Sequence, residues 1–96
     1  MSKPDEYKFR LYIAGDAPNS VQAIANLHEI CREYLPSRHQ IEIVDVLLDP
    51  KRALSDGVLL TPTLVKLSPA PLRKIVGTLG QLQPVLQALG VSPRPE

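Results

Sequence analysis

Apolar and polar positions alternate at the start of the chain and predict a β-strand over residues 8–14. From Ile24 onward the apolar residues recur at helical spacing instead, as far as residue 35. Asn19, with a glutamine three positions later, is typical of a helix start, and Pro36 ends the pattern. The first third of the chain therefore predicts a strand followed by a helix.

Residues 40–49 form a nearly continuous apolar run, which predicts a strand buried on both faces. Asp49 followed by Pro50 is typical of an N-cap and a first helical position, and Gly57 supplies a stop signal. The middle of the chain therefore predicts a second strand and a short second helix.

Two further strands are expected over residues 60–67 and 73–77, joined by a proline-rich turn that favours antiparallel pairing. A last helix is expected to begin at about Leu82, because Pro84 is tolerated only in a first turn. Gly90 supplies the signal that ends it.

The resulting order, β-α-β-α-β-β-α, is that of a single thioredoxin-like α/β domain with a right-handed first crossover. We place the domain at residues 7–90 and expect residues 1–6 and 91–96 to be disordered. Pro62 stands where the third strand begins, the position at which thioredoxin-like folds hold a cis proline. The pattern leaves cis or trans open here.

Composition narrows the class of protein. The chain has 96 residues, 44% of them hydrophobic and 22% charged, as expected for one globular domain. No apolar run approaches the ~18 residues of a membrane span, and the charged first ten residues do not resemble a signal peptide. We therefore expect a cytoplasmic protein without membrane association.

Charge is unevenly distributed along the chain. The formal net charge is only +1 and there are four aromatic residues, which argues against nucleic acid as a partner. Every acidic residue except Glu96 lies at or before Asp56, whereas Lys66, Arg73 and Lys74 follow it. The C-terminal half thus predicts a modest cationic surface suited to an acidic patch on another protein.

The place of a thioredoxin dithiol, residues 14–23, contains no cysteine. The single cysteine, Cys31, falls on the apolar stripe of the first helix, which predicts a buried structural thiol. His28 and Cys31 are three residues apart on a helix and could form part of a metal site, but His39 is a distant third ligand and the signal is weak, so we expect a partly buried His28 and a solvated His39.

Other catalytic patterns are equally weak. Asp45 and Asp49 are four residues apart, but we expect one to face solvent and the other to cap a helix. The glycines do not have the spacing of a phosphate-binding loop. We therefore expect no catalytic residue, no metal and no cofactor, and favour a binding module over an enzyme.

Three segments carry a resemblance to a known family: "LYIAGDAPNSVQAIANL", "IVDVLLDP" and "TPTLVKLSPAPLRKIVG". In this order, and in register from about Tyr7 to Gly77, they resemble the KaiB family of the cyanobacterial circadian clock. The resemblance implies a protein that binds the N-terminal ATPase ring of the autokinase KaiC and, in that complex, captures KaiA. It also implies competition with a KaiB-like sensor domain of an output histidine kinase.

The family is metamorphic, so the resemblance also implies two states. One is a tetrameric ground state with a different C-terminal half, and the other is a thioredoxin-like monomer that binds KaiC. Tyr7, Lys66, Arg73 and Lys74 fall where the family carries an aromatic and basic surface residues, and they are the candidate partner contacts.

Residues around the rearranged half are candidate determinants of the fold state. The chain departs from the family after Gly77, where Thr78 replaces the aspartate of a Gly-Asp-Leu-Ser sequence. Pro84 would obstruct a paired strand more than a first helical turn. We therefore expect the thioredoxin-like monomer rather than the ground-state tetramer. The full set of candidate determinants is Pro62, Pro69, Pro71, Gly77, Thr78, Pro84 and Gly90.

The predicted function is that of a non-enzymatic adaptor that binds a KaiC-like ring and modulates its phosphorylation or output. Two alternatives stay open: a thioredoxin-like redox or stress protein that uses Cys31 alone, and a sensor-type domain that competes for the same ring. The sequence leaves open which ring is bound, whether KaiA is recruited, whether the fold switches and whether a rhythm depends on the protein.

Overall fold

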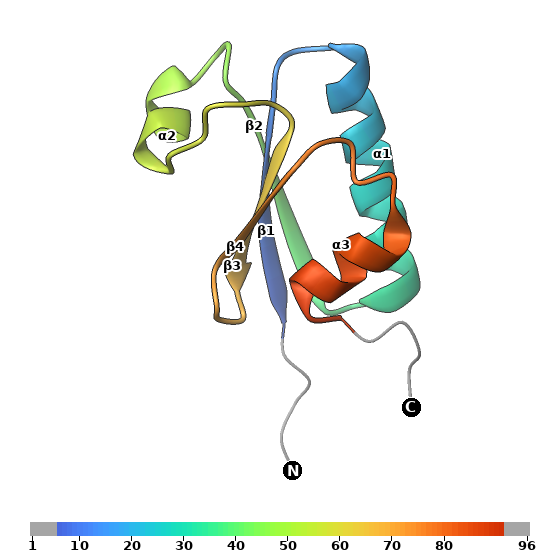
Figure 1. Cartoon of the computed structure of the whole chain (residues 1–96). Helices are drawn as coiled ribbons and strands as arrows, with labels where there is room; N and C mark the ends of the chain where they lie inside the picture. The colour runs from blue at the N-terminus through green and yellow to red at the C-terminus, as the bar shows by residue number, and fades with distance from the viewer. Residues whose placement is uncertain (1–5, 92–96) are drawn as a thin grey trace.

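A four-stranded sheet lies between helices on its two faces in the computed structural model, which describes residues 6–91 (Figure 1). The order of elements is the one predicted from the apolar pattern. The elements are β1 (Tyr7–Ile13), α1 (Pro18–Tyr34), β2 (His39–Asp45), α2 (Pro50–Ser55), β3 (Thr63–Ser68), β4 (Arg73–Val76) and α3 (Leu82–Leu89).

The strands are arranged in the order β2-β1-β3-β4. β1 runs parallel to β2 and antiparallel to β3, and β3 pairs antiparallel with β4. Leu11, at the centre of β1, pairs with Ile43 on one side and Leu64 on the other. β1 is thus an inner strand, and its period-2 pattern supplies buried residues to both faces of the sheet.

Two separate apolar clusters hold the layers together. α2 covers one face, where Ala53 and Val58 pack with Tyr12, Val44 and Val65. α1 and α3 cover the other face (Figure 1). The larger cluster on that face comprises Tyr7, Phe9, Leu11, Ile13, Ala23, Leu27, Ile30, Cys31, Leu35, Leu64, Leu79, Val85, Leu86, Leu89 and Val91.

β2 differs from its prediction in length and in burial. It ends at Asp45 rather than residue 49, because the Asp45 carboxylate accepts hydrogen bonds from the backbone N–H groups of Gly15 and Leu47 and so forms a turn. β2 is also an edge strand in which only Val44 is buried. The prediction of a strand buried on both faces is therefore wrong.

The helix ends follow the proline and glycine signals more closely than the cap residues. α1 begins at Pro18, with Ala17 as its N-cap, so the predicted start at Asn19 falls inside the first turn. Asp49 occupies the N-cap of α2 but makes no side-chain capping bond. α3 spans the predicted residues, with Pro84 in its first turn, and ends at Gly90 with φ +71°.

The three Xaa-Pro bonds at Thr61-Pro62, Ser68-Pro69 and Ala70-Pro71 are cis.

The expected disordered ends, residues 1–6 and 91–96, lie outside the described residues except for Glu6 and Val91. Val91 belongs to the core, and its N–H donates to the Leu86 carbonyl, so the packed domain extends past the predicted boundary. Within residues 6–91 no helix is long and apolar enough to cross a membrane.

Candidate partner-binding surface

The turn between β1 and α1 occupies the place of a thioredoxin dithiol, but the chain closes it with its own groups. The Ala14 N–H donates to Ser20 Oγ at 3.0 Å, and the Gly15 N–H donates to Asp45 Oδ1 at the same distance. Gly15 has φ +54°, and a Cβ built there would lie 3.3 Å from Leu47 Cδ1. The turn is thus a packed corner with no sulfur.

Cys31 is fully buried on α1, as predicted. Desolvation raises the pKa of its thiol to about 12. The expected partial burial of His28 is wrong, since His28 is exposed, whereas His39 is half-buried with its Nδ1 2.7 Å from the Leu35 carbonyl. Among residues 6–91 no group of three or more His, Cys, Asp or Glu side chains could hold a metal ion.

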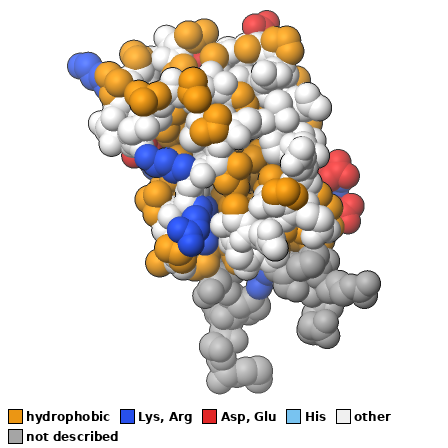
Figure 2. Space-filling view, in the orientation of Figure 1, with side chains coloured by type: hydrophobic (Ala, Val, Ile, Leu, Met, Phe, Trp, Pro, Cys, Tyr) orange, Lys and Arg blue, Asp and Glu red, His pale blue; other side chains and the backbone are white. Residues whose placement is uncertain are grey.

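Five leucines around α2 form the most prominent exposed apolar feature, which we call the leucine surface. Four of them lie in the loops that join α2 to the sheet and one lies on α2 itself. Figure 2 shows hydrophobic side chains gathered over this part of the molecule. Leu47, Leu48, Leu54, Leu59 and Leu60 are between 63% and 85% exposed.

The leucine surface rests on a helix that is tied to the sheet by polar contacts. Arg10 pairs with Glu42 and Asp56, at 2.9 Å each, and Arg52 pairs with Glu42 at 2.8 Å. The Tyr12 hydroxyl donates to the Asp56 carboxylate. The contacts of Arg52 and Asp56 join α2 and its C-terminal end to β1 and β2, so the short helix at the centre of the leucine surface is held in a fixed position.

The ion pairs shift the titration of both carboxyl groups. Hydrogen bonds from Arg52 and then Arg10 lower the pKa of Glu42 to about 2. The pKa of Asp56 is lowered chiefly by the hydrogen bond from Tyr12 and further by Arg10. Both side chains are therefore carboxylates at neutral pH, and the network keeps its charges.

Sequence analysis missed the leucine surface because it assigned Leu47 and Leu48 to a buried strand and Leu60 to the next strand. The available signal was the length of the second helix. Six residues between Pro50 and Ser55 bury a single side chain, Ala53, so they cannot also cover the leucine pairs on either side.

Two of the four predicted contact residues are turned inward. Tyr7 is 8% exposed and its hydroxyl donates to the Gly90 carbonyl at 3.3 Å. Lys66 is 4% exposed, its Nζ donates to the Leu89 carbonyl at 3.4 Å, and it lies 5.9 Å from the centre of the Tyr7 ring. Both side chains meet the end of α3 instead of forming part of an accessible surface.

Arg73 and Lys74 are exposed, but neighbouring strand positions place them on opposite faces of β4. Lys74 pairs across the strands with Val65, and its amine donates to the Asp56 carbonyl beside α2. Arg73 pairs with Lys66, on the face that carries α3. The structure thus brings Lys74, and not Arg73, next to the leucine surface.

The candidate fold-state residues fall into two groups. Pro62 is buried and its carbonyl accepts the Gly77 N–H at 2.9 Å, whereas Pro69 and Pro71 shape the β3–β4 turn. Gly77 has φ +120°, and the Thr78 carbonyl accepts a 2.8 Å bond from the Asn26 side chain of α1. This link holds the loop between β4 and α3 against α1.

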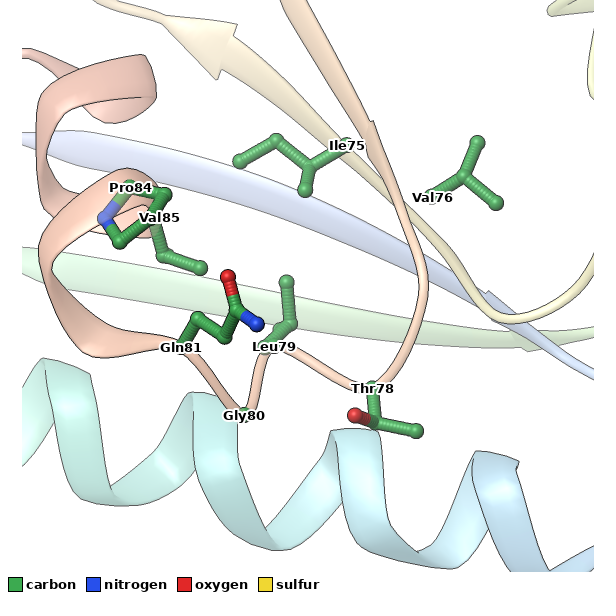
Figure 3. A pocket seen from close by; sticks show the side chains of 8 residues that line it. All are labelled: Ile75, Val76, Thr78, Leu79, Gly80, Gln81, Pro84 and Val85. Carbon is green, nitrogen blue, oxygen red and sulfur yellow. The ribbon is translucent and has the colours of Figure 1, made fainter.

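A cavity of about 340 Å³ lies beside that loop, between β4 and the first turn of α3 (Figure 3). Leu79 has φ +64°, a conformation that favours glycine, and its buried side chain points toward the sheet. Pro84 and Val85 form the α3 side of the cavity. Packing of Leu79 in the core thus holds a strained backbone in place.

Comparison of the sequence with known proteins identifies circadian clock proteins as its relatives. A model of the KaiB domain matches residues 10–91. The chain is 44% identical over 84 residues to the circadian clock protein KaiB3 of Synechocystis sp., covering 88% of this chain and 82% of that protein. It is 39% identical over 89 residues to the circadian clock oscillator protein KaiB of Prochlorococcus marinus, covering 93% and 78%.

A solved structure shares the fold at lower identity. The N-terminal domain of SasA from Synechococcus elongatus superposes with a TM-score of 0.74 and 16% identity, covering all of this chain and 94% of that one. At this identity the likeness concerns the fold alone, and it agrees with the thioredoxin-like arrangement of the sheet.

Proposed function

Because the chain belongs to the KaiB family of circadian clock proteins, we propose that it is a non-enzymatic adaptor that binds a KaiC-type ATPase ring. It binds in its thioredoxin-like form, as a cytoplasmic monomer, and modulates the phosphorylation or output of the ring by protein recognition alone.

The leucine surface is the observation that carries this proposal. Monomeric proteins rarely expose several large apolar side chains together unless a partner covers them. Here the five leucines lie on and beside a helix that two ion pairs, Arg10–Asp56 and Arg52–Glu42, hold against the sheet, so the helix needs little ordering when a partner binds. Such a preformed apolar patch supplies the central contacts of a specific interface.

The other contacts follow from their place around this surface. Lys74 lies beside α2 and is proposed to meet an acidic group at the rim of the interface, and Arg73 is proposed as a second basic contact. Tyr7 and Lys66 act on the partner indirectly, by holding the end of α3. The exposed edge of β2 is free of strand partners within residues 6–91 and offers a site for a further protein such as KaiA.

The proposal is tested by mixing the protein with a purified KaiC-type ring and ATP, followed by size-exclusion chromatography and calorimetry. We expect association without a slow conformational phase, and weakening of about tenfold in the Leu59→Ser/Leu60→Ser variant. Val21→Ser is the control, since Val21 is an exposed aliphatic residue on α1, away from the leucine surface. Absence of binding at high micromolar concentration would reject the adaptor function.

The redox alternative requires an accessible thiol, and the burial of Cys31 argues against it. In the sensor-type alternative the protein binds the same KaiC-type ring but has a different effect on the other proteins that bind it. A competitor would displace a KaiB protein from the ring without recruiting KaiA, which a three-component binding assay would distinguish.

A further inference from the structure

A groove between α1 and α3 lies on the face of the sheet opposite the leucine surface. Its volume is about 340 Å³, near the lower end of the range for binding pockets of roughly 300–1,000 Å³. It therefore has room for one apolar anchor and not for an extended ligand. About half of its lining is apolar, formed by Ile30, Tyr34, Leu79 and Leu82, and Asn26, Glu29 and Glu33 contribute polar groups.

The rim of the groove is acidic. Glu29 and Glu33 lie one helical turn apart on α1, both exposed and both lining the groove. Glu29 has only a 4.0 Å contact with the exposed Arg32, and Glu33 makes no ion pair within residues 6–91. Among the described residues, no basic side chain lines the groove. The groove thus suits an apolar side chain with a cation directly beside it.

The β3–β4 turn of the same chain has that chemistry. Leu72 is 54% exposed at the end of the turn, and the exposed Arg73 follows it. Pro69 and Pro71 limit the conformations of the turn, which lowers the entropy lost on docking. The turn therefore presents an aliphatic anchor and a guanidinium side by side.

Turn and groove lie at opposite margins of the molecule. Figure 2 shows basic side chains over the β3–β4 hairpin and acidic side chains at the far edge, beside α1. One molecule cannot close this contact on itself, whereas a second copy placed head to tail brings the opposite charges together.

We propose that the β3–β4 turn of one copy docks into the α1–α3 groove of another, with Leu72 in the groove and Arg73 against Glu29 and Glu33. The two surfaces differ, so the contact is heterologous and leaves a free turn and a free groove at the ends of every assembly. It is weak, salt-sensitive and dispersed by dilution, because its charges are exposed. It also occupies Arg73, so self-association opposes any partner that uses this residue.

The test is sedimentation velocity of the full chain up to about 1 mM, the weak limit of measurable association, at low and high salt. We expect growth beyond the monomer at low salt that is reversed by salt. Glu29→Gln/Glu33→Gln and Leu72→Ser/Arg73→Gln are each expected to weaken it about tenfold. Each variant keeps one intact surface, so an equimolar mixture is expected to form capped dimers and nothing larger.

The sedimentation experiment contains no ring, so its result tests self-association separately from the proposed function. A wild-type chain that stays monomeric throughout overturns the proposal. Association that both variants retain, and that Leu59→Ser/Leu60→Ser abolishes, also overturns it and assigns self-contact to the leucine surface. Larger assemblies in the mixture would show that the contact is not the one proposed.

Discussion

Thiol labelling of Cys31 separates a binding module from a redox protein most directly. The perturbation is an excess of a disulfide reagent, added to the native protein at about pH 8. Burial raises the pKa of the thiol from 9.0 to about 12. A difference of about three pKa units lowers the thiolate population about 1,000-fold, and only the thiolate reacts.

The burial of Cys31 also limits the labelling rate, because the reagent cannot reach the thiol in the folded protein. Cys31 is 0% exposed and packs within the cluster that joins α1 to the sheet and α3, so the reagent must wait for that cluster to open. If opening requires global unfolding, at ~5 kcal/mol, the open fraction is on the order of 10⁻⁴. By either route the native protein reacts at least about 1,000-fold more slowly than the unfolded chain.

The assay follows release of the chromogenic thiol in buffer and in denaturing urea, with Cys31→Ala as the blank. A matched control places a cysteine at the exposed Ser55 in the Cys31→Ala chain, where labelling is expected to be fast in both conditions. Native labelling of Cys31 within about tenfold of the unfolded rate would refute the reasoning. It would return the single-cysteine redox function to consideration.

Three further predictions concern stability. Leu59→Ser/Leu60→Ser is expected to change the free energy of unfolding by less than about 0.5 kcal/mol per site, because both side chains are exposed; a loss above ~2 kcal/mol in urea titration would mean that they are structural. The pKa of Glu42 in the fold, about 2, lies below its ordinary 4.5, so its contribution to stability is complete above pH 4.5 and is lost as the pH falls toward 2. Glu42→Gln should therefore flatten the acid side of the stability profile, and an unchanged profile would contradict the Arg10 and Arg52 pairs. Desolvation lowers the pKa of Lys66 in the folded protein below its ordinary 10.5. Between the folded pKa and pH 10.5, the free energy of unfolding of the wild type should therefore rise with pH relative to that of Lys66→Met. The same dependence of stability on pH in both proteins would contradict the burial of the amine.

The order of elements was predictable because local signals carried it. Alternation identified β1, and proline and glycine marked the limits of the short helices, as Pro84 and Gly90 do for α3. Strand order is not a local property, however. The apolar run over residues 40–49 predicts burial, yet pairing leaves β2 at an edge with one buried residue. That misassignment hid the exposure of Leu47 and Leu48, and with it part of the candidate binding surface.

The family resemblance named candidate contact residues, but it did not predict which of their side chains are exposed. Tyr7 and Lys66 sit on β1 and β3, and both donate to carbonyl groups at the end of α3, where the helix dipole is negative. If the segment after β3 refolded, the phenol and the amine would lose these acceptors while staying in a largely apolar setting. The two residues therefore stabilise the observed thioredoxin-like arrangement by holding α3 in place, and we expect a partner that binds this arrangement to gain from them without touching either side chain.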